Sequence, residues 1–260
     1  MDRGNVSLLA PTLPGCTGVL MAGIFHVLGC SADLEPQPSP TVQPGAVGRV
    51  NQLGRPRCTA PAANGGSPET IEQAILLLDA LPKPTSVACF LESLDRPLYA
   101  FATSSSFSAQ PAFSRRSPRV FLKKNQLIIS AVIEGDSSYL VEFSYLLEGD
   151  RSTKGELHFP ITEPVQASAP YDRVLFDGGT VCRTCHGREE RVVDMTFASV
   201  YSSDAFRPNP NYQVKLDFLA QEAQACDFAN QPARCEMLSA IFDGGPVHDA
   251  EFPETMKVFF

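Results

Sequence analysis

The sequence predicts an α+β fold in which an antiparallel, sandwich-like β-meander lies between an N-terminal helix and a C-terminal helical segment. Three observations carry this prediction. Apolar residues recur at helical spacing after residue 67, and they alternate with polar residues in short runs between residues 98 and 160. Helical spacing then returns after residue 215. Because the strands come as one block, we expect neighbouring strands to pair as an antiparallel meander.

The first helix is expected to begin near Ser67, which can cap it, with Pro68 at the first helical position. Pro82 and Pro84 then end it, because proline cannot continue a helix. A second short helix is expected over residues 86–94. The inner face of the first helix is formed by Ile71, Ala74, Ile75 and Leu78.

The strands of the meander are short β-rich runs separated by turn signals such as "EGDSS" and "EGDRS". In the fourth run, Val141 and Phe143 point to one face, whereas Glu142 and Ser144 point to the other. We therefore expect a sheet with one covered face and one polar face. The five runs are residues 98–104, 119–124, 126–134, 138–147 and 155–160.

Two helices are expected near the C-terminus, and each carries a cysteine on its apolar stripe. In the first, Leu216, Leu219 and Ala223 form a stripe that Cys226 continues. The second begins at Pro232, and Cys235, Leu238 and Phe242 form its inner stripe. Both cysteines thus lie where a disulfide could clamp a helical hairpin.

The first 29 residues are typical of an export signal, because one early arginine precedes a short apolar run. The run ends in "VLGC", residues 27–30, which resembles the lipobox of bacterial lipoproteins. That resemblance implies that Cys30 is lipidated and anchors the chain to a membrane, in the periplasm or at the outer membrane surface. Cleavage elsewhere and a short membrane anchor are the alternatives. Residues 30–66 are rich in Pro, Gly and Ser and are expected to form a tether.

The composition and motifs exclude several functions. The net charge is -8, without a long basic run, so we expect no nucleic-acid partner. The chain has no Gly-x-Ser-x-Gly elbow and no metalloprotease histidine pair, so a hydrolase is not indicated.

The chain has eight cysteines, and an even number in an exported domain favours disulfides. Cys16 and Cys30 fall in or at the end of the leader, which leaves six. If Cys182 and Cys185 serve a cofactor, the simplest pairing of the others joins neighbours in the sequence. The expected disulfides are then Cys58–Cys89 and Cys226–Cys235, although spacing alone does not fix connectivity.

The motif "CRTCH" places Cys182, Cys185 and His186 in a Cys-x-x-Cys-His pattern. Two thiols at this spacing lie on one side of a helical turn and can reach the two vinyl groups of a haem, with the histidine under the iron. Three other uses compete: a redox dithiol, a structural disulfide, and a zinc site completed by Cys226 or Cys235. Spacing and export favour haem. Glu189 and Glu190, beside the motif, are interpreted as a solvated helix face.

At this motif, and at most over residues 171–260, the sequence resembles bacterial c-type cytochromes. The resemblance implies one covalent haem c, with thioethers at Cys182 and Cys185 and with His186 as the proximal iron ligand. A sixth ligand could come from Met237 or His248, or the sixth position could be open. The β-rich region upstream has no counterpart in a small cytochrome.

The sequence thus predicts an exported, lipid-anchored monohaem protein that acts as an electron carrier rather than an enzyme, or as a haem-based sensor. Its partners would be haem, a redox partner protein and the membrane that holds its lipid. The alternative is a non-enzymatic cell-surface binding lipoprotein in which disulfides or zinc serve only as staples. The expected organisation is a signal peptide (1–29), a tether (30–66), a helix plus antiparallel β domain (67–170) and a cytochrome c-like haem-binding segment (171–260).

Overall fold

The computed structural model describes residues 54, 57–62 and 65–259. The expected signal peptide, the lipidation site at Cys30 and most of the tether lie outside the described residues. None of the helices described is both long enough and apolar enough to cross a membrane.

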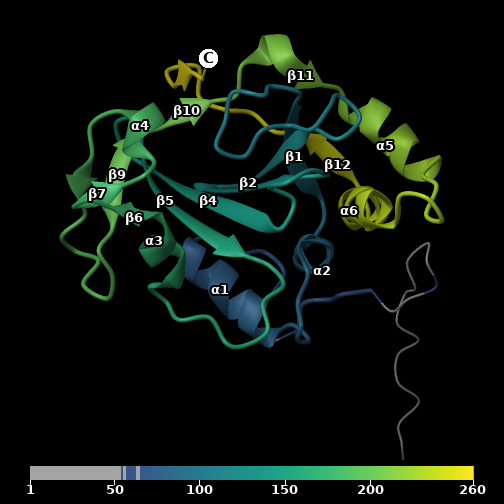
Figure 1. The fold of residues 1–260 in the computed structure, drawn as a ribbon, viewed down its shortest axis with the longest axis horizontal. Helices are drawn as coiled ribbons and strands as arrows, with labels where there is room; N and C mark the ends of the chain where they lie inside the picture. Colours follow the sequence, from purple (N-terminus) through teal and green to yellow (C-terminus); the bar gives the residue numbers. More distant parts are fainter. Residues whose placement is uncertain (1–53, 55–56, 63–64, 260) are drawn as a thin grey trace, which may run out of the picture. The chain divides into compact units, whose positions relative to one another are not determined.

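The described chain is built on one mostly antiparallel sheet with the strand order β11-β1-β2-β3-β4-β5-β9-β8 (Figure 1). The predicted meander is therefore present as β1 to β5, and the α+β class is confirmed. β12 also pairs with β1, in parallel. The strands of this sheet are β1 (Leu98–Thr103), β2 (Arg119–Lys124), β3 (Leu127–Val132), β4 (Leu140–Leu147), β5 (Arg151–His158), β8 (Glu190–Arg191), β9 (Tyr201–Asp204), β11 (Gln213–Val214) and β12 (Val247–Asp249).

Two small strand pairs and several short helices complete the fold. The strand pairs are β6 (Leu175–Phe176) with β7 (Gly179–Thr180), and β10 (Phe206–Arg207) with β13 (Lys257–Val258). The helices are α1 (Ile71–Ala80), α2 (Val87–Glu92), α3 (Ala169–Val174), α4 (Arg183–His186), α5 (Leu216–Gln224) and α6 (Pro232–Phe242), with a 3-10 turn at Pro210–Tyr212.

The first helix begins later than the sequence predicts. Its cap is Thr70, whose hydroxyl accepts a hydrogen bond from the backbone nitrogen of Gln73 at 3.2 Å. Ser67 donates instead to the carboxylate of Asp95 at 2.9 Å, so it is not the cap. Both residues are good N-caps, and the tertiary contact with Asp95 selects Thr70.

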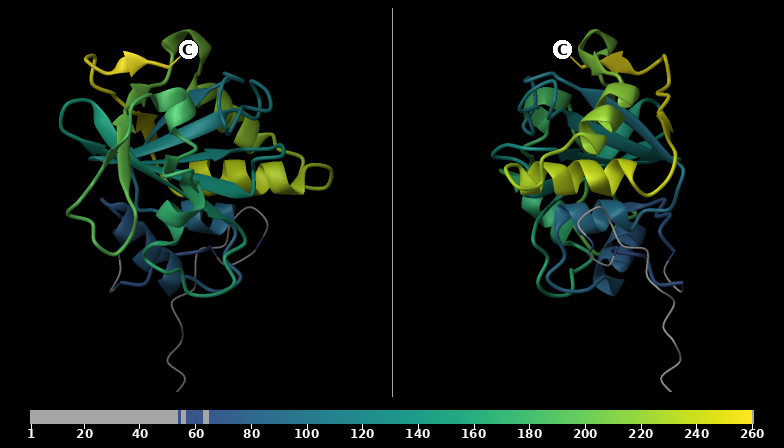
Figure 2. Two further views of the ribbon diagram at one scale, coloured as in Figure 1. Left: turned by 60° about the vertical axis from the view of Figure 1, so that its left-hand side comes forward. Right: turned by 90° about the vertical axis from the view of Figure 1, so that its right-hand side faces the viewer.

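The two faces of the sheet differ in chemistry. α1 and α2 lie on one side, and α4, β10 and the C-terminal strand lie on the other (Figures 1 and 2). The helix-covered face is apolar, and its buried side chains form one core with those of α1, α2, α5 and α6. That face includes Ala100, Val120, Ile129, Val141 and Leu157.

The opposite face carries Arg119, Ser130, Glu142 and Lys154. It was expected to be the polar, uncovered face. The structure covers part of it with α4, β10 and the segment around Phe259, so these polar groups lie beneath a second layer of chain. Ion pairing makes this covering tolerable, because Arg119 Nη2 donates to Glu142 at 2.5 Å and to Ser130 at 2.8 Å.

The sequence predicts residues 67–170 and 171–260 as separate segments, but their described parts belong to one compact unit. β9 pairs with β5, and β11 and β12 both pair with β1. The C-terminal segment therefore supplies strands to the sheet of the preceding segment as well as helices.

Both expected disulfides are formed in the structure. Cys58–Cys89 joins the start of the described chain to α2, and Cys226–Cys235 joins the end of α5 to α6. Cys235 is fully buried, as its place on the inner stripe of α6 requires.

Gly155 allows α3 to approach β5 closely. A Cβ at this position would lie 2.8 Å from Pro170 Cβ and 3.1 Å from the Pro170 carbonyl oxygen. We expect Gly155→Ala to lower the free energy of unfolding by about 1–3 kcal/mol, because one of the two elements must shift. Urea unfolding of the variant and the wild type measures this change in the free energy of unfolding. Ala167→Val, at an exposed position before α3, should stay within about 0.5 kcal/mol of wild type, and an equal effect of both changes would contradict the argument.

The two disulfides should stabilise the fold unequally. Their sequence separations are 31 for Cys58–Cys89 and 9 for Cys226–Cys235. In the chain-entropy description, removing them by paired Cys→Ser changes should cost about 3.7 and about 2.6 kcal/mol, respectively. Urea unfolding of the two double variants checks the order, and a larger loss for the shorter loop would show that effects other than loop entropy dominate.

Candidate functional site

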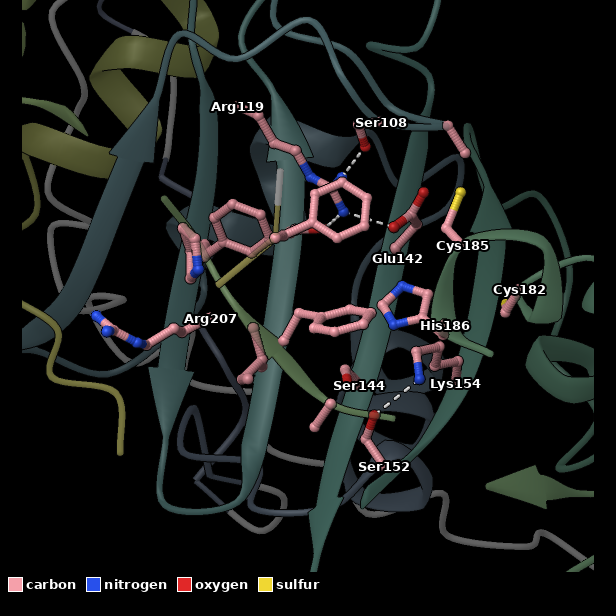
Figure 3. Close-up of a pocket in the computed structure, with 18 of the residues that line it drawn as sticks. Ser108, Arg119, Glu142, Ser144, Ser152, Lys154, Cys182, Cys185, His186 and Arg207 are labelled. Atoms are coloured by element: carbon pink, nitrogen blue, oxygen red, sulfur yellow. Dashed lines mark hydrogen bonds and ion pairs between the residues drawn. The ribbon is translucent and has the colours of Figure 1, made fainter. Parts of the chain in front are cut away.

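A cavity of about 230 Å³ lies between the polar face of the sheet and the Cys-x-x-Cys-His motif (Figure 3). The sheet contributes Arg119, Glu142 and Lys154 from β2, β4 and β5. The motif faces them from α4 and its N-cap: Cys182, which precedes the helix, lines the cavity together with Cys185 and His186. The rest of the lining is largely aromatic and aliphatic, including Phe107, Phe121, Val174, Val181, Phe206, Phe252 and Phe259. The structure thus brings the three predicted haem-site residues to one cavity.

The motif adopts a single helical turn, which is closed by hydrogen bonds within its own backbone. The backbone nitrogen of His186 donates to the Cys182 carbonyl at 2.9 Å. Gly187 then ends the turn with a φ of 70°, in the left-handed region that favours glycine.

A side-chain clamp fixes the start of this turn. The backbone nitrogen of Cys182 donates to Thr180 Oγ1 at 3.1 Å. Glu189 in turn accepts from the backbone nitrogen of Thr180 at 2.7 Å and from its hydroxyl. The interpretation of Glu189 as part of a solvated face is therefore wrong, since its carboxylate joins the two ends of the motif loop. Glu190 is exposed, in β8.

Cys182 and Cys185 are free thiols, whereas the other four described cysteines are paired in disulfides. This arrangement excludes a zinc site completed by Cys226 or Cys235, because each of those sulfurs is bonded to the other. Within the described residues, no group of three or more His, Cys, Asp and Glu side chains is arranged to hold a metal ion.

The environment of Cys182 does not favour dithiol chemistry. Burial raises the pKa of the Cys182 thiol, although the Thr180 hydroxyl and the Lys154 ammonium oppose the rise. A dithiol nucleophile needs the opposite shift, towards the thiolate.

His186 is held as a neutral imidazole. Burial lowers the pKa of His186 to about 4, and the nearby charge of Lys154 acts in the same direction. Its Nδ1 lies 2.8 Å from the carbonyl oxygen of Asp204, at the end of β9. A carbonyl can only accept, so Nδ1 carries the proton and Nε2 carries the free lone pair. The ring packs against Phe206 and Phe259, with centroid distances of 5.0 and 5.8 Å.

No family model, curated protein or solved structure matches this chain.

The two residues suggested as a sixth iron ligand do not line the cavity. Met237 is buried in the hydrophobic core, on the helix-covered side of the fold. His248 lies in β12, where its ring packs against Tyr99 at a centroid distance of 5.7 Å. The structure thus separates both side chains from His186.

Sequence reasoning missed the charged residues on the floor of the cavity: Arg119, Glu142 and Lys154. Glu142 and Arg119 lie within predicted strands, but nothing in the sequence identifies what covers them. Lys154 precedes the expected fifth strand, which was placed at residues 155–160, whereas β5 runs over Arg151–His158. Extending that strand to follow the "EGDRS" turn would have placed Lys154 on the polar face.

The donor set fits a covalently attached haem. Two unpaired thiols could form thioethers, and a neutral imidazole with a free Nε2 is the form that ligates iron. Aromatic walls suit a flat apolar macrocycle, and Arg119 and Lys154 offer positive charge to acidic substituents. The cavity of about 230 Å³ is smaller than a whole haem, so part of such a group would lie outside it, on the side of the exposed Cys185.

Thiol labelling tests the state of the motif in protein prepared without haem. We expect iodoacetamide to modify Cys185 faster than Cys182, because Cys185 is exposed and burial raises the pKa of Cys182. The four disulfide cysteines should stay unmodified, and peptide mass spectrometry separates all six sites. Recovery of a Cys182–Cys185 disulfide under native, non-reducing conditions would contradict the free-thiol state.

Proposed function

We propose that this protein is an exported c-type haem protein that carries one haem on Cys182, Cys185 and His186 and transfers single electrons. One observation carries the proposal: the motif presents two unpaired thiols and a neutral imidazole to a single cavity, while the other described cysteines are oxidised. Thioether attachment needs both motif cysteines as reduced thiols, and these are the two described cysteines that form no disulfide.

Each motif residue has a distinct role in this proposal. Cys182 and Cys185 would attach the macrocycle, and His186 would ligate iron through Nε2. The Asp204 carbonyl fixes the tautomer and the orientation of the imidazole, as an acceptor on the second ring nitrogen does at metal sites. The Thr180–Glu189 clamp holds the motif turn in place before any ligand enters.

Haem held there would supply a one-electron couple, in which iron(III) takes up one electron from a donor to become iron(II). The proposed activity is electron transfer rather than bond-making chemistry; at the floor of the cavity Arg119 is paired with Glu142, and Lys154 donates to the Asp204 carbonyl. The exposed position of Cys185 would leave a short path from the haem edge to a redox partner at the surface.

The position of the site in the cell is part of the same proposal. We infer attachment of a lipid at Cys30, with the folded unit held outside the cytoplasm by the tether. The two disulfides are in keeping with an oxidising compartment. Haem-based sensing is the second candidate, favoured by the placement of Met237 and His248 away from the cavity.

Haem staining tests the proposal directly. The full chain is expressed in a bacterium that exports it and attaches haem to Cys-x-x-Cys-His motifs. We expect a band that stains for haem on a denaturing gel and a sharp α-band in the reduced spectrum, because thioether-bound haem survives denaturation. Cys182→Ala/Cys185→Ala should lose the stain completely, whereas the control Cys226→Ala/Cys235→Ala should keep it per mole of folded protein.

A colourless, folded wild type would overturn the haem proposal and favour the cell-surface binding lipoprotein instead. For a red protein, carbon monoxide separates the two uses of the haem. A shifted Soret band in the reduced protein would indicate an open sixth position and sensing, and an unchanged spectrum would indicate a six-coordinate electron carrier.

A further inference from the structure

Lys154 occupies an unusual position for a lysine. It lies in the middle of β5, on the sheet face beneath α4, and its side chain lies beside His186 in the cavity (Figure 3). The ammonium donates to Ser152 Oγ at 2.9 Å, to Ser203 Oγ at 2.7 Å and to the Asp204 carbonyl at 3.3 Å. None of these three acceptors carries a formal charge, so the positive charge is solvated by the protein rather than neutralised at contact distance.

The third acceptor connects Lys154 to the motif. The Asp204 carbonyl oxygen also accepts the Nδ1 proton of His186, at 2.8 Å. One oxygen therefore serves both the ammonium and the imidazole, and its two lone pairs are shared between them.

Two other charged groups near Lys154 are paired with opposite charges, whereas Arg207, at the cavity wall, donates to the Met256 carbonyl at 3.1 Å. Arg119 contacts the Glu142 carboxylate at 2.5 Å, and the Asp204 carboxylate contacts Lys257 at 2.8 Å and Arg151 at 3.3 Å. Lys154 thus differs from Arg119 and Arg151, because its own hydrogen bonds, beside the imidazole, go only to neutral acceptors.

We propose that Lys154 is a positioning residue that raises the reduction potential of a haem bound through His186. The inference rests on the proposed function and concerns the redox property of that same site. Two effects act in one direction. Reduction removes one positive charge from the iron, so a fixed cation nearby favours the reduced state, and a poorly solvated interior screens that effect little.

The second effect acts through the shared carbonyl. An ammonium on the Asp204 oxygen withdraws electron density from the acceptor of the His186 Nδ1 proton. The imidazole then becomes a weaker donor, and a weaker donor stabilises iron(III) less. The step remains a one-electron reduction, with the electron supplied by the mediator of the titration, and Lys154 neither gains nor loses a proton in it.

Potentiometric titration of the haem-loaded full chain tests the inference. We expect Lys154→Met to lower the equilibrium constant for reduction about tenfold, which is 59 mV for a one-electron couple. Lys154→Arg keeps the charge and should stay within about a factor of two of wild type. Lys124→Met is the matched control, because it removes a lysine charge from an exposed position at the end of β2, and it should leave the potential unchanged.

Lys154→Gln separates the effect of the charge from the effect of the hydrogen bond to the Asp204 carbonyl. It also provides a second uncharged variant in case Lys154→Met does not load haem. It can still donate to the Asp204 carbonyl but has no charge, so its potential should fall by less than that of Lys154→Met. Unchanged potentials in the uncharged variants that load haem would overturn the role of Lys154 while leaving the proposed function intact. A wild type without haem would overturn both, and the staining experiment shows which outcome applies.

Discussion

The hydrogen bond from His186 to the Asp204 carbonyl is the contact on which the candidate site depends. Asp204 ends β9, and β9 pairs with β5 in the central sheet. The imidazole is therefore tied to the sheet backbone, although the motif itself is a single turn of helix. The Thr180–Glu189 clamp, the Arg151 hydrogen bond to the Arg188 carbonyl and the pairing of β8 with β9 also hold the motif loop, but the Asp204 carbonyl is the contact that fixes the imidazole itself.

The cysteines divide into two classes by the structure around them. Cys235 is buried on α6 and pairs with Cys226 across a short connection, and Cys58 pairs with α2 through Cys89. Cys182 and Cys185 lie on one turn that is too short and too exposed to belong to a core. Their side chains line the cavity rather than the hydrophobic core.

The parts that the sequence predicts well are those with local signals. The alternation in β4, the helical stripe of α6 and the neighbouring cysteines each depend on residues close in the chain. β11 and β12 were not anticipated, because strands of two or three residues carry no measurable period. The cap moved from Ser67 to Thr70 for a similar reason, since the contact with Asp95 is made across distant sequence. The cavity depends on α4 covering the sheet, and no local pattern encodes that packing.

The burial of Lys154 costs stability but places a positive charge at the cavity. Burial lowers the pKa of its ammonium to about 8, because the site solvates the charge less well than water does. A methionine of similar length would avoid that penalty and would suit the aromatic walls of the cavity. The fold instead provides Ser152, Ser203 and the Asp204 carbonyl as acceptors, and it keeps the amine protonated at neutral pH. Charged groups that are buried at a cost in stability, yet hydrogen-bonded there, occur where a site uses their charge, and among the described residues that line the cavity this charge lies beside His186.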